Sequence, residues 1–395
     1  MRELSLYIHF PYCLYKCHYC DFNSYVVKDS SSLQMPYIEA LLQELKVAKR
    51  NFSLQSFKTI FLGGGTPSLF EPKNIGALLK GIEAELGIAP QAEITLEANP
   101  KTLSREKIRD YLATGVNRFS MGVQSFQDRF LTPLGRLHTG KEAIQALSLL
   151  EEEAQNFSFD LMFGFPEQSL SDLKEDLSWI DRFNAKHLSF YNLTLEEGTI
   201  FAEQYRKGKL KLLESDLQAQ MYETGIQLLQ DKGYSLYEIS NFSKPGLESR
   251  HNLNYWNYGD YLGLGAGAVS FLSRTFLGAN ACIPQEKDLY GFRWTNAKAP
   301  ETYLQGAGKD CSQHSWEKIS SAIAQKEFWM MGLRLKEGVS IEKFEKRFGP
   351  GSYKPYSGIV ESLLRNNWIE HSEDRIRLHP KGQLLANEVI ASFFI

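Results

Sequence analysis

The sequence predicts an α/β protein, built on a parallel sheet and ending in a smaller α+β module. Over the first 240 residues, seven short runs rich in β-branched and aromatic residues alternate with amphipathic segments. Repeated strand–helix–strand units form right-handed crossovers and a parallel sheet. The pattern leaves open whether this sheet closes into a barrel. The expected strands are 4–10, 59–64, 92–99, 118–124, 157–165, 187–193 and 235–240.

One expected helix shows how these segments are recognised. Apolar side chains recur at helical spacing over 170–183. Ser169 and Asp172 stand in the order of a capping box, in which each residue satisfies a backbone N–H of the first turn. A helix is therefore predicted to begin directly after Ser169.

The chain is expected to form three parts, with the first ending at residue 240. Residues 241–315 are rich in Asn, Tyr, Gly and Trp with weak periodicity, so we expect a connecting region with little regular structure. From residue 316, helices are followed by two strands around a turn at Glu373–Asp374 and by a closing helix. This order predicts a winged-helix-like domain over 316–395. Its last 80 residues carry no pronounced basic excess, so a packing or lid module is favoured over nucleic-acid binding.

Composition places the chain among globular proteins of a reducing compartment. Its 395 residues are 43% hydrophobic, and the formal net charge of −3 gives no reason to expect nucleic acid or an anionic membrane as a partner. The longest apolar candidate for a span, YLGLGAGAVSFL, is too short for a bilayer. An odd number of cysteines and no visible signal peptide indicate a cytoplasmic protein without a disulfide framework.

Three of the five cysteines lie within eight residues, in the stretch PYCLYKCHYCDF. Cys13, Cys17 and Cys20 follow the first expected strand, at the end where parallel α/β folds build their sites. Thiolates bind zinc, copper(I) or iron–sulfur clusters, but a structural zinc site needs four protein ligands. Three thiolates can instead hold three irons of a [4Fe–4S] cluster and leave the fourth open. Cys282 and Cys311 are isolated and expected to be inert.

The spacing C-x₃-C-x₂-C closely resembles that of radical S-adenosylmethionine (SAM) enzymes. The resemblance implies a partial (βα)6-type barrel with a [4Fe–4S] cluster on the three cysteines and SAM bound to the open iron. It also implies transfer of one electron into the sulfonium, with release of methionine and a 5′-deoxyadenosyl radical.

Residues at the ends of later strands are expected to contact SAM. The run GGGTPS resembles a GGE-like motif that receives the methionine amino group, and polar residues at strand ends point into a barrel mouth. The whole chain also resembles the oxygen-independent coproporphyrinogen III oxidase superfamily. The SAM set that these resemblances imply is Tyr7, Phe22, Gly64, Gly65, Thr66, Glu97, Gln124, Arg136, Asp160 and Thr194.

Two features indicate which branch of this superfamily the chain resembles. The oxidases carry a fourth cysteine two places after the third, where this chain has Phe22. The run HNLNYW fits an H-N-x-x-Y-W motif that marks the heme chaperones. In this motif His251 offers an imidazole to heme iron, and Tyr255 and Trp256 offer flat faces to a porphyrin.

The resemblance to heme chaperones implies delivery of heme to an acceptor protein. The alternative is radical oxidative decarboxylation of the propionates of coproporphyrinogen III, so whether the chain is an enzyme stays open. A structural zinc site in a regulatory winged-helix protein is a third hypothesis.

Overall fold

The computed structural model describes residues 4–277, 288–309 and 315–394, and its centre is a 12-stranded sheet. Six adjacent strands of this sheet run parallel, each hydrogen-bonded to the next. They match the first six predicted strands. The strands at 4–10 and 118–124 have the predicted bounds. The parallel strands are β1 (Leu4–Phe10), β4 (Phe57–Gly64), β5 (Ile88–Ala98), β6 (Arg118–Gln124), β7 (Phe157–Phe163) and β8 (His187–Asn192).

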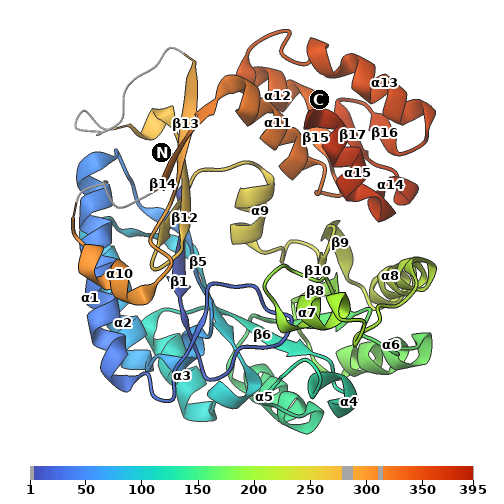
Figure 1. Cartoon of the computed structure of the whole chain (residues 1–395). Coiled ribbons are helices and arrows are strands. Elements are labelled where there is room, and N and C mark those ends of the chain that lie inside the picture. The colour runs from blue at the N-terminus through green and yellow to red at the C-terminus, as the bar shows by residue number, and fades with distance from the viewer. Residues whose placement is uncertain (1–3, 278–287, 310–314, 395) are drawn as a thin grey trace.

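Helices follow the parallel strands and lie on the outside of the curved sheet (Figure 1). Each helix turns an apolar stripe inward: in α2 the buried residues include Ile75, Leu79 and Ile82, spaced four and three residues apart. The capping box of Ser169 and Asp172 is present, so the predicted helix start is confirmed. These helices are α1 (Ser31–Asn51), α2 (Pro72–Glu85), α3 (Arg105–Thr114), α5 (Gly140–Glu153), α6 (Leu170–Ser178) and α8 (Ser215–Asp231).

The described sheet stays open, with a linear strand order from β14 at one edge to β9 at the other. The predicted partial (βα)6-type barrel is therefore confirmed. The seventh predicted strand, β9 (Ser235–Glu238), does not extend the parallel series. It pairs antiparallel with β10 (Asn241–Ser243), which pairs antiparallel with β8.

The expectation of little regular structure over 241–315 is wrong for the described residues. Strand β11 (Tyr261–Leu264) pairs parallel with β1. Antiparallel strands β12 (Val269–Ser273), β13 (Leu289–Thr295) and β14 (Ser315–Ser320) extend the sheet beyond it. The sequence YLGL does not alternate because β11 is an inner strand in which Leu262, Gly263 and Leu264 are all buried. The division of the chain at residues 240 and 315 stays a prediction.

Two short helices complete this middle region, α9 (Arg250–Trp256) and α10 (Pro300–Gly306). Helix α9 lies near the middle of the molecule in Figure 1, between β12 and the C-terminal module. None of the described helices combines the length and apolar character needed to cross a membrane.

The C-terminal module has its own core, centred on Trp329, whose ring stacks on Phe393 at 4.7 Å. A three-stranded sheet in the order β15-β17-β16 packs against the helices, so the predicted winged-helix-like arrangement is confirmed. In Figure 1 the module lies at upper right, above α8. Its elements are α11 (Ser321–Gly332), β15 (Val339–Ser340), α12 (Ile341–Phe348), α13 (Ser357–Arg365), β16 (Ile369–Ser372), β17 (Arg375–Leu378), α14 (Pro380–Leu384) and α15 (Ala386–Ala391).

Candidate functional site

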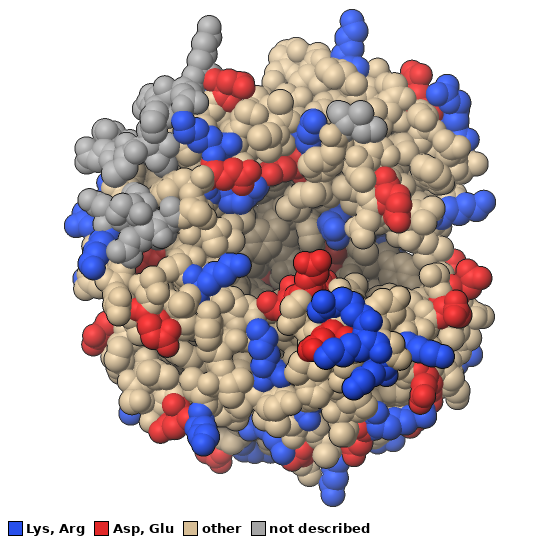
Figure 2. All heavy atoms as spheres, in the orientation of Figure 1, with Lys and Arg blue, Asp and Glu red and all other residues tan. Residues whose placement is uncertain are grey.

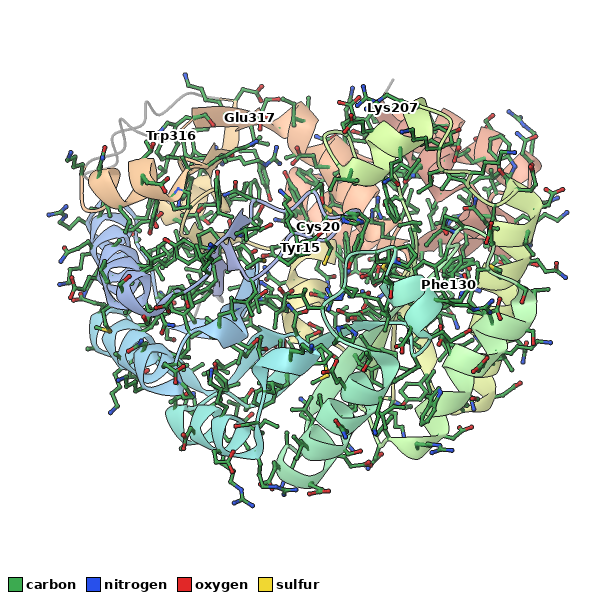
Figure 3. The ribbon with its side chains drawn as sticks, turned by 60° about the horizontal axis from the view of Figure 1, so that its bottom comes forward. Tyr15, Cys20, Phe130, Lys207, Trp316 and Glu317 are labelled. Carbon is green, nitrogen blue, oxygen red and sulfur yellow. The ribbon has the colours of Figure 1, made fainter. Side chains whose placement is uncertain are left out.

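The carboxyl ends of the parallel strands surround a cavity of about 620 Å³. Cys13, Cys17 and Cys20 all line it, on the loop that follows β1. Figure 2 shows this face of the molecule hollowed at its centre. In Figure 3, Cys20 and Tyr15 lie together in the middle of the molecule. The prediction that the three cysteines share one site at the strand ends therefore agrees with the fold.

The cysteine loop, residues 11–24, is fixed along its length by backbone hydrogen bonds. It begins in β2 (Tyr12–Cys13), which pairs with β3 (Tyr25–Val26). In its middle, the His18 N–H donates to the Leu134 carbonyl at 2.9 Å, and the His18 carbonyl accepts from Phe201 N–H at 3.0 Å. Phe201 belongs to α7 (Ile200–Arg206), so the loop is held between two neighbouring segments.

The end of the cysteine loop is anchored through Asn23. Its side-chain amide donates to the carbonyls of Ala266 and Lys298, both at 2.9 Å. The carbonyl of Asn23 lies 2.8 Å from Nε2 of His9, and the Tyr7 hydroxyl lies 2.9 Å from Nδ1 of the same ring. A neutral His9 with its proton on Nε2 satisfies both bonds. The three thiols are thus presented by a loop with few free backbone torsions.

Three soft thiols on one loop are suited to hold an iron–sulfur cluster. Among the described residues, no three His, Cys, Asp or Glu side chains converge closely enough to hold one metal ion. A [4Fe–4S] cluster needs no such convergence because each thiolate binds a different iron. Both ring nitrogens of His18 are engaged, by the Pro133 carbonyl and the Tyr15 hydroxyl, so His18 is not available as a further ligand here. Cys282 and Cys311 lie outside the described residues.

Burial favours the neutral form of the Cys13 and Cys20 thiols before a metal binds. It raises the pKa of Cys13, and it raises the pKa of Cys20 to about 11. Iron binding would have to displace those protons, since the thiolate is the ligand.

The glycine loop after β4 contacts the cysteine loop directly. The N–H of Gly65 donates to the Phe10 carbonyl at 2.7 Å, and the N–H of Thr66 donates to the Tyr12 carbonyl at 2.9 Å. The Thr66 hydroxyl lies 3.4 Å from Sγ of Cys13. Gly64 has φ +110°, and a Cβ there would lie 2.6 Å from the ring of His9. The glycines therefore permit two loops to lie in contact beside the thiols.

Arg136 reaches the cavity from the segment before α5 and contacts Cys17. Its Nη1 lies 3.5 Å from the Cys17 Sγ, and its Nη2 donates to Oδ1 of Asn99 at 2.6 Å. Asn99 in turn donates to the Thr66 hydroxyl at 3.0 Å. Asn99 was missed by the sequence analysis, although its position one residue after β5 was the available signal. It joins the guanidinium to the glycine loop.

Two partly buried carboxyl groups, those of Glu97 and Asp160, also line the cavity. Burial, together with the nearby Asp160, raises the pKa of Glu97 to about 8, although the Gly64 N–H donates to it at 3.1 Å. Burial also raises the pKa of Asp160. A bound cation would favour the ionised form of both groups. This part of the cavity thus suits a ligand that carries positive charge.

Gln124 has a strained backbone at the end of β6. Its φ of +73° is in the left-handed region, which costs a residue with a side chain about 1–2 kcal/mol. Its Oε1 accepts a hydrogen bond of 2.7 Å from the Tyr191 hydroxyl, which holds the amide at the cavity. Strain of this kind is concentrated at functional sites. Phe22, with 56% of its surface exposed, and Thr194 lie at the rim.

Nine of the ten residues predicted to contact SAM line this one cavity, and Tyr7 does not. The pKa of the Tyr7 phenol is raised by burial and, to a smaller extent, by the nearby carboxylate of Glu97. The roles of all ten residues toward SAM stay predictions. The nine lining residues are Phe22, Gly64, Gly65, Thr66, Glu97, Gln124, Arg136, Asp160 and Thr194.

The residues predicted to bind heme lie elsewhere, on α9. His251 is 1% exposed, and both of its ring nitrogens are engaged: Nδ1 with the Thr59 hydroxyl at 2.8 Å and Nε2 with the Tyr255 hydroxyl at 2.9 Å. Burial lowers the pKa of His251 to about 3, so the ring is neutral. In this arrangement neither nitrogen is open to iron. Heme ligation by His251 stays a prediction, and it requires α9 to rearrange.

Comparison with known proteins gives the same architecture. Residues 7–180 match the Radical SAM superfamily and residues 324–385 match the HemN C-terminal domain. The proteins named heme chaperone HemW from Haemophilus influenzae and Escherichia coli are 38% and 36% identical to this chain; the alignments cover 100% of it and 98% of each relative. The chain belongs to the HemW family. The Bacillus subtilis member is 34% identical over 98% of both chains.

A solved structure extends the likeness in fold. Coproporphyrinogen III oxidase HemN of Escherichia coli, a radical SAM enzyme, superposes with a TM-score of 0.81 at 21% identity, covering 99% of this chain and 90% of that one. At this identity the likeness concerns the fold alone. This chain and HemN therefore share the barrel and the C-terminal module as folds.

Proposed function

We propose that this protein holds a [4Fe–4S] cluster on Cys13, Cys17 and Cys20, binds SAM beside it, and carries heme to an acceptor protein. The observation that carries the proposal is the single cavity that unites the three thiols with nine predicted SAM contacts. The residues fit both groups: soft thiolates for iron, and the partly buried carboxyls of Glu97 and Asp160 for a sulfonium and an ammonium.

The protein's own residues would hold and orient the two cofactors. The thiolates bind three irons, and Arg136 places a positive charge beside Cys17. Glu97 and Asp160 would lie near the positively charged groups of SAM. The glycine loop would contact the amino-acid part of its methionine. When bound and reduced, such a cluster supplies one electron to the sulfonium of SAM.

Heme transport follows from the family. Relatives that match the chain from end to end are named heme chaperones, and Phe22 stands where coproporphyrinogen oxidases carry a fourth cysteine. The acceptor would be a protein in the cytoplasm. That nucleic acid is not a partner stays a prediction.

The test is one anaerobic preparation assayed in two ways. Reconstituted full-length protein is titrated with hemin, and a parallel sample is incubated with coproporphyrinogen III, SAM and a reductant. The proposal predicts saturable hemin uptake with one heme per chain and no decarboxylated porphyrinogen. Turnover of the porphyrinogen would instead establish the oxidase activity, and absence of hemin binding would refute the chaperone role.

A further inference from the structure

A buried arginine lies inside the barrel, below the residues that line the cysteine cavity. Arg118 is the first residue of β6 and is 3% exposed. Its guanidinium donates to the hydroxyls of Ser158 at 3.1 Å and Thr95 at 3.5 Å, and the ion pairs found within the described chain do not include it. A charge that is removed from water needs compensating charge nearby. The surroundings of Arg118 should therefore contain it.

The parallel register of the sheet arranges the side chains around Arg118 in two layers. Residues two apart on a strand point to the same face. Arg118 and Ser120 of β6 lie opposite Thr95 and Glu97 of β5, and β7 and β8 continue the register on the other side. The deeper layer is buried and contains Thr95, Arg118, Ser158 and His187; the upper layer lines the cavity and contains Glu97, Ser120, Asp160 and Ser189.

A chain of hydrogen bonds joins Arg118 to the carboxyl of Asp160. Arg118 donates to Ser158, and the Ser158 hydroxyl donates to the Ser120 hydroxyl at 3.1 Å. The hydroxyls of Ser189 and Ser120 in turn bond the Asp160 carboxyl. Because each hydroxyl of the chain accepts from the deeper layer and donates toward the cavity, the chain favours the ionised form of Asp160.

Three other titratable groups that face Arg118 do not compensate its charge. His187 of β8 and His251 of α9 are buried, and burial together with the charge of Arg118 lowers the pKa of both rings. Burial raises the pKa of the Tyr237 phenol on β9. All three groups are therefore uncharged around neutral pH.

The carboxyl pair, Glu97 and Asp160, is left to compensate Arg118. Burial raises the pKa of both groups, and the positive charge of Arg118 opposes this rise. Arg136 acts on Asp160 in the same direction from the segment before α5, whereas the negative charge of Asp160 acts against ionisation of Glu97. The phenols that face the pair, whose pKa burial raises, are those of Tyr7, Tyr19 and Tyr191.

We propose that Arg118 is a positioning residue for the carboxyl pair, and that it holds Asp160 ionised and oriented through Ser158 and Ser120. The inference rests on the proposed binding of SAM and adds the group that prepares the cavity for its positive charge. Two neighbouring carboxyls disfavour each other's ionisation. With Arg118 beneath them, Asp160 is ionised before the cation arrives, so binding does not have to remove its proton.

The first test follows the carboxyl of Asp160 itself. Isotope-edited infrared spectra of the reconstituted full-length protein, labelled at its aspartate carboxyls, report ionisation as the pH is raised, and Asp160→Asn identifies the band. Arg118→Met removes the charge, and Ser158→Ala breaks the chain but keeps the charge. Thr95→Val is the matched control, because Thr95 contacts the guanidinium without belonging to the chain. Thermal unfolding and iron content report on the integrity of each variant.

Arg118→Met should raise the pH at which Asp160 ionises by about one unit or more, as expected for loss of a nearby opposite charge. Ser158→Ala should raise it by a smaller amount, and Thr95→Val should leave it unchanged. The same midpoint in wild type and in folded Arg118→Met would overturn the inference. If Arg118→Met does not fold, an unchanged midpoint in Ser158→Ala overturns it instead.

The second test measures SAM binding by calorimetry over the same pH range. Below the midpoint, a rise of one unit lowers the ionised fraction about tenfold. Arg118→Met should therefore bind SAM about tenfold more weakly there and approach wild type as the pH rises. S-Adenosylhomocysteine, whose sulfur carries no charge, should lose less affinity. An equal loss for both ligands at every pH would indicate a change in the shape of the cavity and would overturn the inference.

The two tests separate the possible failures. If wild type binds no SAM at any pH, the proposed function fails, and the role of Arg118 toward a ligand fails with it. If wild type binds SAM, and neither the Asp160 midpoint nor the pH dependence of binding changes in the folded variants, only the inference is overturned.

Discussion

Replacing Gly65 by alanine would add one methyl group between the glycine loop and the cysteine loop. The new Cβ would lie 2.7 Å from the Tyr12 carbonyl oxygen, 2.9 Å from the Phe10 carbonyl oxygen and 3.0 Å from the Cys13 Sγ. Two of these three atoms belong to the backbone, so no side-chain rotation relieves the overlap. The loops must separate, and Cys13 must move with them.

The cost can be worked out from these contacts. Overpacking of a closely packed site costs about 1–3 kcal/mol. Separation of the loops also weakens the hydrogen bonds from the Gly65 and Thr66 N–H groups, each worth about 0.5–1.5 kcal/mol. We expect Gly65→Ala to lower the free energy of unfolding by about 2–6 kcal/mol. It should also lower the iron content, because one of the three ligands is displaced.

Denaturant unfolding and iron analysis after anaerobic reconstitution measure the two effects. Gly358→Ala is the matched control, since a Cβ there meets no atom within 4 Å and α13 should gain up to about 1 kcal/mol. If Gly65→Ala unfolds like wild type and binds as much iron, the reasoning about the loop contact is refuted.

Three further predictions concern charge. The affinity for SAM should rise as the pH rises through about 8, because the carboxyl of Glu97 is neutral below that pH and its ionised form attracts the cation. Calorimetric titrations of Glu97→Gln should show weaker binding and no such dependence on pH. The free energy of unfolding should fall on acidification from pH 6.5 toward 3, by up to about 1.4 kcal/mol per pH unit, because His251 is protonated in that range only in the unfolded state. Chemical denaturation of His251→Gln should show a smaller loss of stability over the same pH range. Arg347→Lys should lower the unfolding free energy by about 2 kcal/mol, since an ammonium group cannot reproduce the planar fork that bonds the carbonyls of Asn257 and Tyr258 from two nitrogens. Equal stability in denaturant titrations would contradict this.

The cysteine cavity could be predicted because its parts come from strand ends. In a parallel sheet the carboxyl ends of all strands meet at one edge, so residues as distant in sequence as Cys13 and Asp160 are brought together by topology alone. The six strands were recognisable by their β-branched and aromatic content. A residue at the carboxyl end of a predicted strand could therefore be expected to lie at the cavity.

Other features depend on contacts that no local pattern encodes. Strand β11 exists because β1 offers it an edge, and its glycine-rich sequence gives little sign of this. Asn99 gains its place from the side chains of Arg136 and Thr66, which are distant in sequence. His251 looked like a free imidazole beside aromatics, but the hydroxyls of Thr59 and Tyr255 occupy it. Tertiary neighbours decide each of these cases.

Electron paramagnetic resonance of an oxygen-free, dithionite-reduced sample, read together with its iron content, tests the cofactor assignment most directly. Three thiolates holding a cubane with one exposed iron predict about four irons per chain and a signal that changes when SAM is added. Cys20→Ala should lose both properties. A sample without iron, or a signal indifferent to SAM, would contradict the account.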